Sequence, residues 1–518
     1  MAFGIMVVQL DGSVVSVANP TIATSLHASL EGIQWVTTGY LLALAGLLIP
    51  AGLVADKIGH KTAFLIGVSG FSLASLLCGL SGSVEMLIGA RVLQAVFGAM
   101  LGPAGLAILR AAFPPEKLSM AFGWFGSVSA VALAGGPILG GLLVEHASWP
   151  WVFYINLPFG IVAVLVGLFV IKKSQRVPQR LDLPGAITLT LALVSLVWGV
   201  TRVQAAGSWS SPNVLGFMGL GVALLIVFVI IESRTKSPMV PLGLFRVRSF
   251  SAGCLVTIVS MFAFFAILFY LTFYLQGVQG KSPLQAAVAL LPLTLLFTVA
   301  APIAGAAAGK FGNRATLLLG AACTTSSLLL LLRLGADSGE MALVPSLVLA
   351  GFGAGFMMIP AIEAIVGNAP VDKAGVASGV QQSTQQLGST LGIAVFGSLL
   401  SSVVTAKFAP ALTTAFGGDN DAVKHVVNDE SLLKSVELGF PPAVQQGLQQ
   451  QLAGAKTDAG TAEQFVGTVT RVAHDTFING MHTVFLLAAC CAAASGLFSL
   501  LIRTKKSDAS APDGALSA

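Results

Sequence analysis

The sequence predicts an all-α protein that crosses a lipid bilayer many times. Only 9% of its 518 residues are charged and 55% are hydrophobic, whereas about 25% of the residues of a soluble domain are charged. The mean hydropathy is +0.88. The apolar runs are continuous and about 20 residues long, the length that crosses a hydrocarbon core of about 30 Å as a helix. The strands of a membrane β-barrel would instead alternate apolar and polar residues.

Pro, Gly and short charged clusters divide the chain into fourteen apolar runs, and we expect each run to be one membrane-spanning helix. The predicted spans cover residues 3–24, 34–55, 62–82, 86–109, 120–144, 150–171, 184–203, 213–232, 250–275, 285–308, 315–334, 342–365, 378–404 and 480–502. An even number of spans places both termini on the same side of the membrane.

The basic residues predict the orientation. Eighteen of the 27 Lys and Arg residues lie in loops that follow even-numbered spans or in the C-terminal tail, whereas the short loops after odd-numbered spans hold only Arg202, Lys281 and Arg333. Loops rich in Lys and Arg tend to stay in the cytoplasm. We therefore expect a multi-pass protein of a bacterial plasma (inner) membrane, with both termini cytoplasmic.

Several function classes are disfavoured by what the sequence contains. The five cysteines lie inside apolar runs without metal-ligand spacing, so we expect no metal site. We find no P-loop, HExxH or nucleophile elbow, which argues against an enzyme or an ATP-driven pump. We expect no cofactor, because an ion gradient would supply the energy. The net charge of +5 is scattered singly and in pairs, so a nucleic-acid partner is not expected.

The stretch GLVADKIGHK (52–61) has a counterpart 253 residues later. The matching pairs are Gly52 with Gly305, Lys57 with Lys310, Gly59 with Gly312, and Lys61 with Arg314. Secondary transporters are often built from such repeats, with the substrate site between them. We therefore predict a six-helix half over 1–171, two extra helices with cytoplasmic linkers over 172–249, and a second six-helix half over 250–518 that includes a long external segment, 405–479. The alternative is that any short cytoplasmic loop selects Gly and basic residues.

Five stretches together resemble the fourteen-helix drug:proton antiporter branch of the major facilitator superfamily. They are GLVADKIGHK (52–61), LDGSVVSVANP (10–20), LIGARVLQAVFGAM (87–100), GGPILGG (135–141) preceded by Gly123, and WPWVFYINLPFG (149–160). With RLDLPGA (180–186), PLGLFRVRSF (241–250), YLQGVQGKSP (274–283) and ASGVQQSTQQLG (377–388), which are also similar to this branch, the resemblance covers nearly the whole chain outside 405–479. Single positions depart from the family pattern, at Val54, Lys57, His60, Ala95, Phe97, Ala132 and Pro150. The resemblance implies two bundles that rock around a central cavity.

Asp11 is the only carboxylate deep in a predicted span, and Arg91 is the only cation inside one. Ionisable groups at that depth are costly and mark function by default. Asp11 could take up and release a proton, whereas Arg91 cannot lose its own. The resemblance implies a role for Arg91 in proton coupling, so we predict that Asp11 and Arg91 communicate directly or through water and Gln94. The alternative is a static buried pair.

Two further motifs are expected to govern the conformational change. The resemblance implies a gating latch at Gly52, Asp56, Lys57, Gly59 and Lys61. Asp56 could accept bonds from the N-terminus of a facing helix, and the lysines could pair with Asp56 or with lipid headgroups. The resemblance also implies an antiporter motif, Gly123, Gly136, Pro137, Gly140 and Gly141, that lines the seam between halves and limits leak. Ordinary close helix packing explains the same glycines.

The substrate cavity is expected to be aromatic and weakly polar. Phe262, Phe265, Phe269 and Phe273 share one helical face, which could line a cavity or face lipid. The candidate lining residues are Gln34, Asn156, Phe265, Phe269, Tyr270, Gln276, Gln382 and Gln385. Glu363 is expected at the cytoplasmic end of its span as an interfacial carboxylate.

Together these features predict a proton-coupled multidrug or antibiotic efflux antiporter that exports lipophilic small molecules by alternating access. Its expected partners are the substrate, protons and the lipid bilayer, and a periplasmic adaptor is left open. Segment 405–479, with a Gln-rich helical pattern at 445–454 and a break at 417–420, could be an external lid or a partner surface. The alternatives are a lipid or fatty-acid exporter, which a lateral opening would favour, and a non-transporting membrane sensor or assembly partner.

Overall fold

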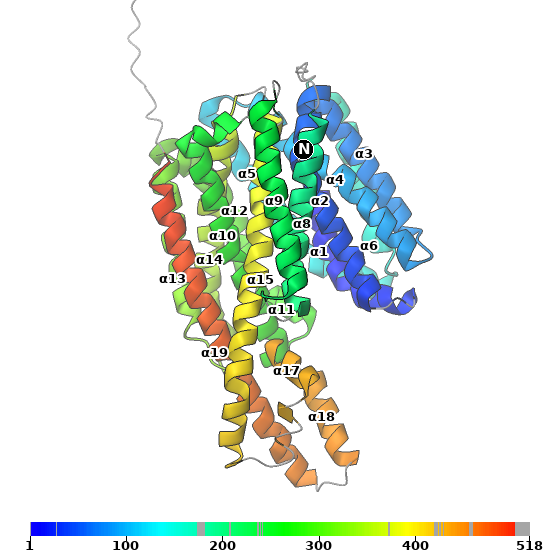
Figure 1. Cartoon of the computed structure of the whole chain (residues 1–518), viewed down its shortest axis with the longest axis vertical. Helices are drawn as coiled ribbons and strands as arrows, with labels where there is room; N and C mark the ends of the chain where they lie inside the picture. Colours follow the sequence, from blue (N-terminus) through cyan, green and yellow to red (C-terminus); the bar gives the residue numbers. More distant parts are fainter. Residues whose placement is uncertain are drawn as a thin grey trace, which may run out of the picture.

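A computed structural model describes residues 2–26, 28, 30–172, 182–206, 209–235, 238, 240, 242–370, 373–418, 423, 426–427, 429–454 and 459–502. Within these residues every regular element is helical, and the long helices lie roughly side by side (Figure 1). The all-α architecture predicted from the apolar runs is confirmed.

Each predicted span coincides with helix in the structure. The helices that carry the spans are α1 (Ala2–Ser25), α2 (Leu30–Ile58), α3 (His60–Gly79), α4 (Val84–Ala112), α5 (Pro115–His146), α6 (Trp151–Tyr154) with α7 (Asn156–Val170), α8 (Leu183–Ala206), α9 (Pro212–Arg234), α10 (Arg248–Phe273) with η2 (Tyr274–Val278), α11 (Pro283–Ala289) with α12 (Leu291–Phe311), α13 (Asn313–Leu331), α14 (Glu340–Ile362) with η3 (Glu363–Gly367), α15 (Ala374–Ala415) and α19 (Ala459–Ser499). Twelve of these stretches are long and apolar enough to cross a bilayer. The other two predicted spans lie in α1 and α5, which have 24 and 32 residues.

The helices before α8 and after α9 pack in a similar order. Helix α1 packs against α5, α2 against α4, and α3 against α4 and α7; later in the chain α10 packs against α15, α12 against α14, and α13 against α14 and α19. Gly59 and Gly312, at equivalent positions of the sequence repeat, have φ angles of 93° and 84° and each separates two long helices. Backbone with positive φ favours glycine. The two sets of helices meet where α5 packs along α12 and α2 along α15.

Helices α8 and α9 pack against each other, and α8 also contacts α2 and α15. Thr190 Oγ1 donates a hydrogen bond of 3.0 Å to the Gly46 carbonyl of α2. The rings of Trp35 and Trp198 stack with centroids 4.8 Å apart. Figure 1 shows the α8–α9 pair in front of the gap between the blue helices and the green, yellow and red ones. The pair therefore covers one seam between α2 and α15.

The segment predicted as a long external connection begins and ends inside helices. Helix α15 continues to Ala415, and α19 already starts at Ala459. Gly417 and Gly418 follow α15 with φ angles of 69° and 149°, which fits the predicted break; residues 419–420 lie outside the described part. The helices α17 (Glu430–Glu437) and α18 (Pro442–Gly454) lie at the end of the molecule beyond α8 and α9 (Figure 1). The Gln-rich pattern at 445–454 lies in α18.

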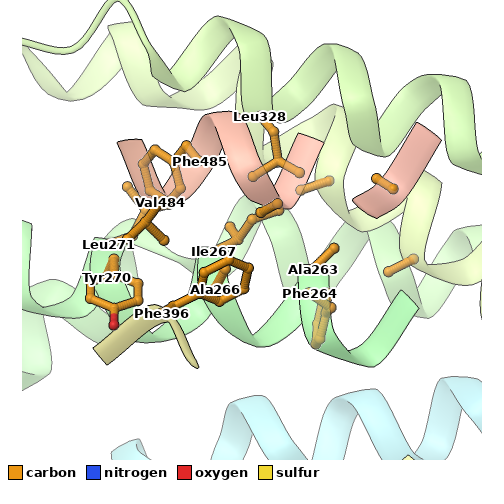
Figure 2. Close-up of a cluster of buried hydrophobic side chains, with 14 of the residues drawn as sticks. Ala263, Phe264, Ala266, Ile267, Tyr270, Leu271, Leu328, Phe396, Val484 and Phe485 are labelled. Atoms are coloured by element: carbon orange, nitrogen blue, oxygen red, sulfur yellow. The ribbon is translucent and has the colours of Figure 1, made fainter. Parts of the chain in front are cut away.

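Apolar side chains from four helices form a core beside α10. Figure 2 shows Tyr270 and Leu271 of α10 packed near Val484 and Phe485 of α19, with Phe396 of α15 and Leu328 of α13 in the same cluster. All six side chains are buried. This packing fixes α10 against α13, α15 and α19.

Candidate functional site

Arg91 and Asp11 meet in the interior of the bundle. Arg91 Nη1, on α4, donates to Asp11 Oδ2, on α1, at 2.5 Å. The two residues are 1% and 0% exposed. The two ionisable groups that stood out in the sequence are thus a direct ion pair. Removing one partner of such a pair leaves an uncompensated buried charge.

Side-chain amides complete the surroundings of the Asp11 carboxylate. Oδ1 accepts hydrogen bonds from Gln94 Nε2 at 3.0 Å and from Asn156 Nδ2 at 2.9 Å. Gln94 also accepts from Arg91 Nη1 at 2.5 Å and donates to Ser75 Oγ at 2.7 Å. The Asp11 carboxylate thus accepts hydrogen bonds from three different side chains. Asn156, proposed for the substrate cavity, therefore lies in the ion-pair cluster instead, because α7 begins beside α1 and α3.

Tyr40 of α2 separates the ion pair from the central cavity. The Arg91 guanidinium lies 3.9 Å from the centroid of the Tyr40 ring, and Arg91 Nε donates to the Val36 carbonyl at 3.4 Å. Tyr40 also lines the cavity, and its buried hydroxyl has no hydrogen-bond partner in the part of the chain that the structure describes. Sequence reasoning missed Tyr40 and Ser75. The sequence contained one indication for Tyr40, since it is one of only four tyrosines in the chain.

A cavity of about 390 Å³ lies at the centre of the bundle. Its lining comes from α1, α2, α5, α8, α10, α12, α14 and α15, and the described lining residues include no Asp, Glu, Lys or Arg. The polar groups are hydroxyls and amides, from Gln9, Ser13, Thr38, Tyr40, Ser129, Thr201, Gln385, Gln386, Ser389 and Thr390. The apolar part includes Met261, Phe264, Phe265, Phe297 and Met358. Ligand sites typically combine such apolar walls with a few polar groups.

The predicted cavity residues divide into five groups. Phe265 and Gln385 line the central cavity. Phe269 and Tyr270 line a neighbouring pocket together with Phe273. Gln276 and Gln382 belong to neither lining; Gln382 lies against Gly102 of α4. Asn156 lies in the ion-pair cluster, and the side chain of Gln34 is outside the described part of the structure.

Asp56 lies near the end of α2 and bonds to the backbone at the start of α15. Its Oδ1 accepts from the Gly375 nitrogen at 2.9 Å, and its Oδ2 accepts from the Val376 nitrogen at 3.1 Å. The first N–H groups of a helix lack intrahelical partners and attract anions. A Cβ atom on Gly52 would clash with the Gly375 carbonyl. Gly52 and Asp56 thus let α2 and α15 meet backbone to backbone.

His60, not a lysine, is the side chain beside Asp56. His60 Nε2 lies 2.7 Å from Asp56 Oδ1. Lys61 donates to the Leu168 carbonyl at 2.7 Å, and Lys57 forms no ion pair among the described residues. The proposed pairing of Asp56 with Lys57 or Lys61 is therefore wrong for this conformation. His60 begins α3 directly after the break at Gly59, and its ring reaches back to the Asp56 carboxylate.

Most glycines of the antiporter motif mark close contacts of α5. A Cβ on Gly123 would come within 2.6 Å of the Ala301 carbonyl oxygen of α12, and one on Gly140 within 3.0 Å of the Val14 carbonyl oxygen of α1. A Cβ on Gly136 would meet Ser13, whereas one on Gly141 would meet open space. Pro137 lies within α5. The motif thus brings α5 close to both α1 and α12.

A second polar contact joins α5 to the end of α14. Ser119 Oγ donates to Glu363 Oε2 at 2.5 Å. Glu363 begins the π-helical turn η3, so the carboxylate expected at the membrane interface is bonded to another helix. A Cβ on Gly305 of α12 would clash with the neighbouring Ser119 carbonyl. Small residues and this hydrogen bond hold α5 against α12 and α14 at this end.

Comparisons with known proteins identify the family. The family model of the Major Facilitator Superfamily matches residues 1–393. The tetracenomycin C resistance and export protein of Streptomyces glaucescens is 40% identical over 99% of this chain and 92% of its own length. A puromycin resistance protein of Streptomyces alboniger is 36% identical over 78% of this chain and 81% of its own.

Solved structures share the fold. The proton:xylose symporter XylE superposes with a TM-score of 0.59 at 12% identity, covering 98% of this chain and 95% of that one. The human organic anion transporter MFSD10 gives a TM-score of 0.55 at 16% identity, covering 77% and 92%. The sequence matches show that this chain is a multi-pass membrane protein of the major facilitator superfamily of transporters.

Proposed function

We propose that this protein is a proton-coupled antiporter that exports lipophilic small molecules, antibiotics among them. The observation that carries the proposal is the buried Arg91–Asp11 pair, which Tyr40 links to an uncharged central cavity. Relatives named for resistance to or export of tetracenomycin C and puromycin support antibiotics as the cargo.

The proton acts on Asp11. When Asp11 is charged, it accepts bonds from Arg91, Gln94 and Asn156. A proton on the carboxyl group removes the charge that holds the guanidinium, while Arg91 keeps its own proton. Arg91 is then free to shift against the Tyr40 ring, and Tyr40 borders the cavity. Proton and substrate thus favour different conformations, which is the requirement for coupling.

The cavity lining favours neutral or weakly charged aromatic cargo. Its walls hold phenylalanine and methionine side chains with hydroxyl and amide groups, and the described lining is uncharged. A doubly charged cation would find no carboxylate there to replace its lost hydration. Flat aromatic molecules that carry hydroxyl or carbonyl groups can pack against the apolar walls and form hydrogen bonds with the hydroxyl and amide groups of the lining.

Alternating access would come from rocking of two six-helix halves, 1–171 and 250–518, with α8 and α9 between them. The similar packing order of the two helix sets and the paired Gly59 and Gly312 turns support this division. The Asp56 contact with α15 and the Ser119–Glu363 contact would close one face of the molecule. We propose that this face and both termini are cytoplasmic, as the distribution of basic residues indicates.

Lipid export is less well supported. A lipid would need a lateral opening between the halves, and α8 covers the α2–α15 seam with the Thr190–Gly46 bond and the Trp35–Trp198 stack. A purely sensory role would not require a central cavity of this size with an uncharged lining.

Transport in vesicles tests the proposal. A growth-inhibition screen across antibiotic classes in an efflux-deficient bacterial host, with and without an uncoupler, first identifies a substrate. Inverted vesicles then take up that substrate under an imposed proton gradient. Asp11→Asn is expected to abolish gradient-driven uptake, whereas Asp475→Asn, on an exposed part of α19, is the matched control and keeps it. Undiminished uptake by Asp11→Asn would refute proton coupling through this residue.

A further inference from the structure

A second pocket, which we call the distal pocket, adjoins the central cavity. It has a volume of about 290 Å³ and is lined by Val203 of α8, Phe269, Tyr270 and Phe273 of α10, Gly397, Ser398, Leu400 and Ser401 of α15, and Glu437 and Leu438 at the end of α17. Three of these helices also line the central cavity.

The two sites follow one another along the same helices. On α10 the central cavity is lined up to Phe265 and the distal pocket starts at Phe269; on α15 the corresponding residues are Ala394 and Gly397. Each step is about one helical turn, or about 5 Å. The distal pocket therefore lies directly beyond the central cavity, on the side of α17 and α18.

The distal pocket contains a carboxylate, whereas the described lining of the central cavity has none. Glu437 Oε1 accepts a hydrogen bond of 2.6 Å from Ser401 Oγ. Among the described residues Glu437 forms no ion pair, and its side chain is half-buried. A half-buried negative charge without a cationic partner attracts a cation.

A buried hydroxyl and two aromatic rings complete the lining. Tyr270 is 1% exposed, and its hydroxyl has no hydrogen-bond partner among the described residues. In Figure 2 this hydroxyl points away from Val484 and Phe485 of α19. The rings of Phe269 and Phe273 meet edge to face with centroids 4.7 Å apart. Aromatic faces attract organic cations as well as aromatic rings.

A tight turn holds Glu437 over the pocket. Gly439 and Phe440 have φ angles of 83° and 53°, and a positive φ is unusual for phenylalanine. Phe440 is fully buried, and its nitrogen donates to the Ser435 carbonyl at 2.8 Å. A Cβ on Gly277 of η2 would clash with the Leu438 carbonyl, so this turn sits directly on the end of α10. A strained, buried turn of this kind is kept where a precise position is needed.

We propose that the distal pocket is a binding site for an aromatic organic monocation. Glu437 binds the positive charge, Phe269 and Phe273 bind the ring system, and the Tyr270 hydroxyl accepts a hydrogen bond from an N–H group of the ligand. The site would follow the central cavity on the way out, and this place in the path rests on the proposed export function. The binding itself does not depend on a proton gradient.

Equilibrium binding to the full-length protein in lipid nanodiscs tests the site. The probes are ethidium, an aromatic monocation that carries amino groups, and N-phenyl-naphthylamine, an uncharged aromatic fluorophore. Glu437→Gln is expected to weaken ethidium binding about tenfold, since it removes one ionic contact at a half-buried site. Tyr270→Phe is expected to weaken it by roughly threefold, through the loss of one hydrogen bond. Glu463→Gln, an exposed acid on α19, is the matched control and leaves ethidium binding within about twofold of the wild type.

The neutral probe separates a local effect from misfolding. Glu437→Gln protein that binds N-phenyl-naphthylamine as the wild type does is folded, and its loss of ethidium binding then belongs to the pocket. Ethidium binding by Glu437→Gln within about twofold of the wild type, or an equal loss for both probes, would overturn the proposal. Because no gradient is applied, failure of the proposed proton coupling would leave this result unchanged.

Discussion

Asp56 Oδ1 accepts a 2.9 Å hydrogen bond from the backbone nitrogen of Gly375, which is 319 residues away in the chain. With the bond from Val376, it ties the end of α2 to the first turn of α15. The contact closes the bundle at the end where α2 and α15 meet, and it has to break if that end opens.

Asp56→Asn is expected to favour opening at this end. The substitution removes the negative charge and one of the two acceptor oxygens, and charge-assisted hydrogen bonds of this kind contribute about 1.5–3 kcal/mol. The population open at this end should rise at least about tenfold. A cysteine in place of Gln385, which lines the central cavity, reports the change through its rate of labelling by a membrane-impermeant maleimide in inverted vesicles. Lys57→Gln is the control, and equal labelling of both variants would contradict a latch at Asp56.

Arg91→Gln is expected to destabilise the protein by about 3–5 kcal/mol, because it leaves the Asp11 carboxylate buried without its cation. Asp11→Asn/Arg91→Gln, which removes both charges, should recover a large part of this loss. Thermal unfolding in detergent, with the two single variants beside the double, measures the recovery. A double variant no more stable than Arg91→Gln would mean that the charges do not stabilise each other.

The glycines of α5 allow a comparison within one helix. Gly123→Ala is expected to push α5 from α12 and reduce both stability and transport, because its Cβ would lie 2.6 Å from the Ala301 carbonyl oxygen. Gly141→Ala meets open space and should stabilise the helix by up to about 1 kcal/mol. Thermal unfolding and vesicle uptake of both variants check the contrast. Similar behaviour of the two would show that close approach at Gly123 is unimportant.

Helix α8 contributes Val197, Val200 and Thr201 to the wall of the central cavity. Val200→Trp is therefore expected to raise the KM for the bulkiest transported compounds several-fold and to spare smaller ones, because the larger ring occupies cavity space. Leu191→Trp is the matched control, since Leu191 is 50% exposed on the same helix. Uptake kinetics for a size series of substrates give the answer. An unchanged order of preference in Val200→Trp would place the cargo elsewhere.

The sequence predicted fourteen membrane-spanning helices, because such a helix needs a continuous apolar run. Twelve of the described helical stretches are long and apolar enough to cross a bilayer, and the other two predicted spans lie in α1 and α5. The sequence also singled out Asp11 and Arg91, because charge inside such a run is costly. The partners Tyr40, Ser75 and Asn156 could not be identified in this way. Their positions depend on the rotation of each helix about its own axis, which side-chain packing sets and which an almost uniformly apolar helix does not reveal.

The distal pocket was harder to foresee than the central cavity. Phe269 and Phe273 lie on the aromatic face of α10 that the sequence revealed, but Glu437 comes from α17, a short helix outside the predicted membrane spans. Its place above α10 depends on the positive φ angles of Gly439 and Phe440. Phenylalanine gives no sequence signal for such a conformation.

Helix α15 has 42 residues and is therefore about 63 Å long, twice the thickness of the hydrocarbon core. One end is the first turn bonded to Asp56, and the other lies at the end of the molecule that also holds α17 and α18 (Figure 1). When a helix of this length tilts by about 10° about one end, its other end moves by about 10 Å. Opening at the Asp56 end should therefore move the opposite end of α15, which extends beyond the lipid. An antibody fragment that holds α17 and α18 against α10 should stop transport without contacting the substrate.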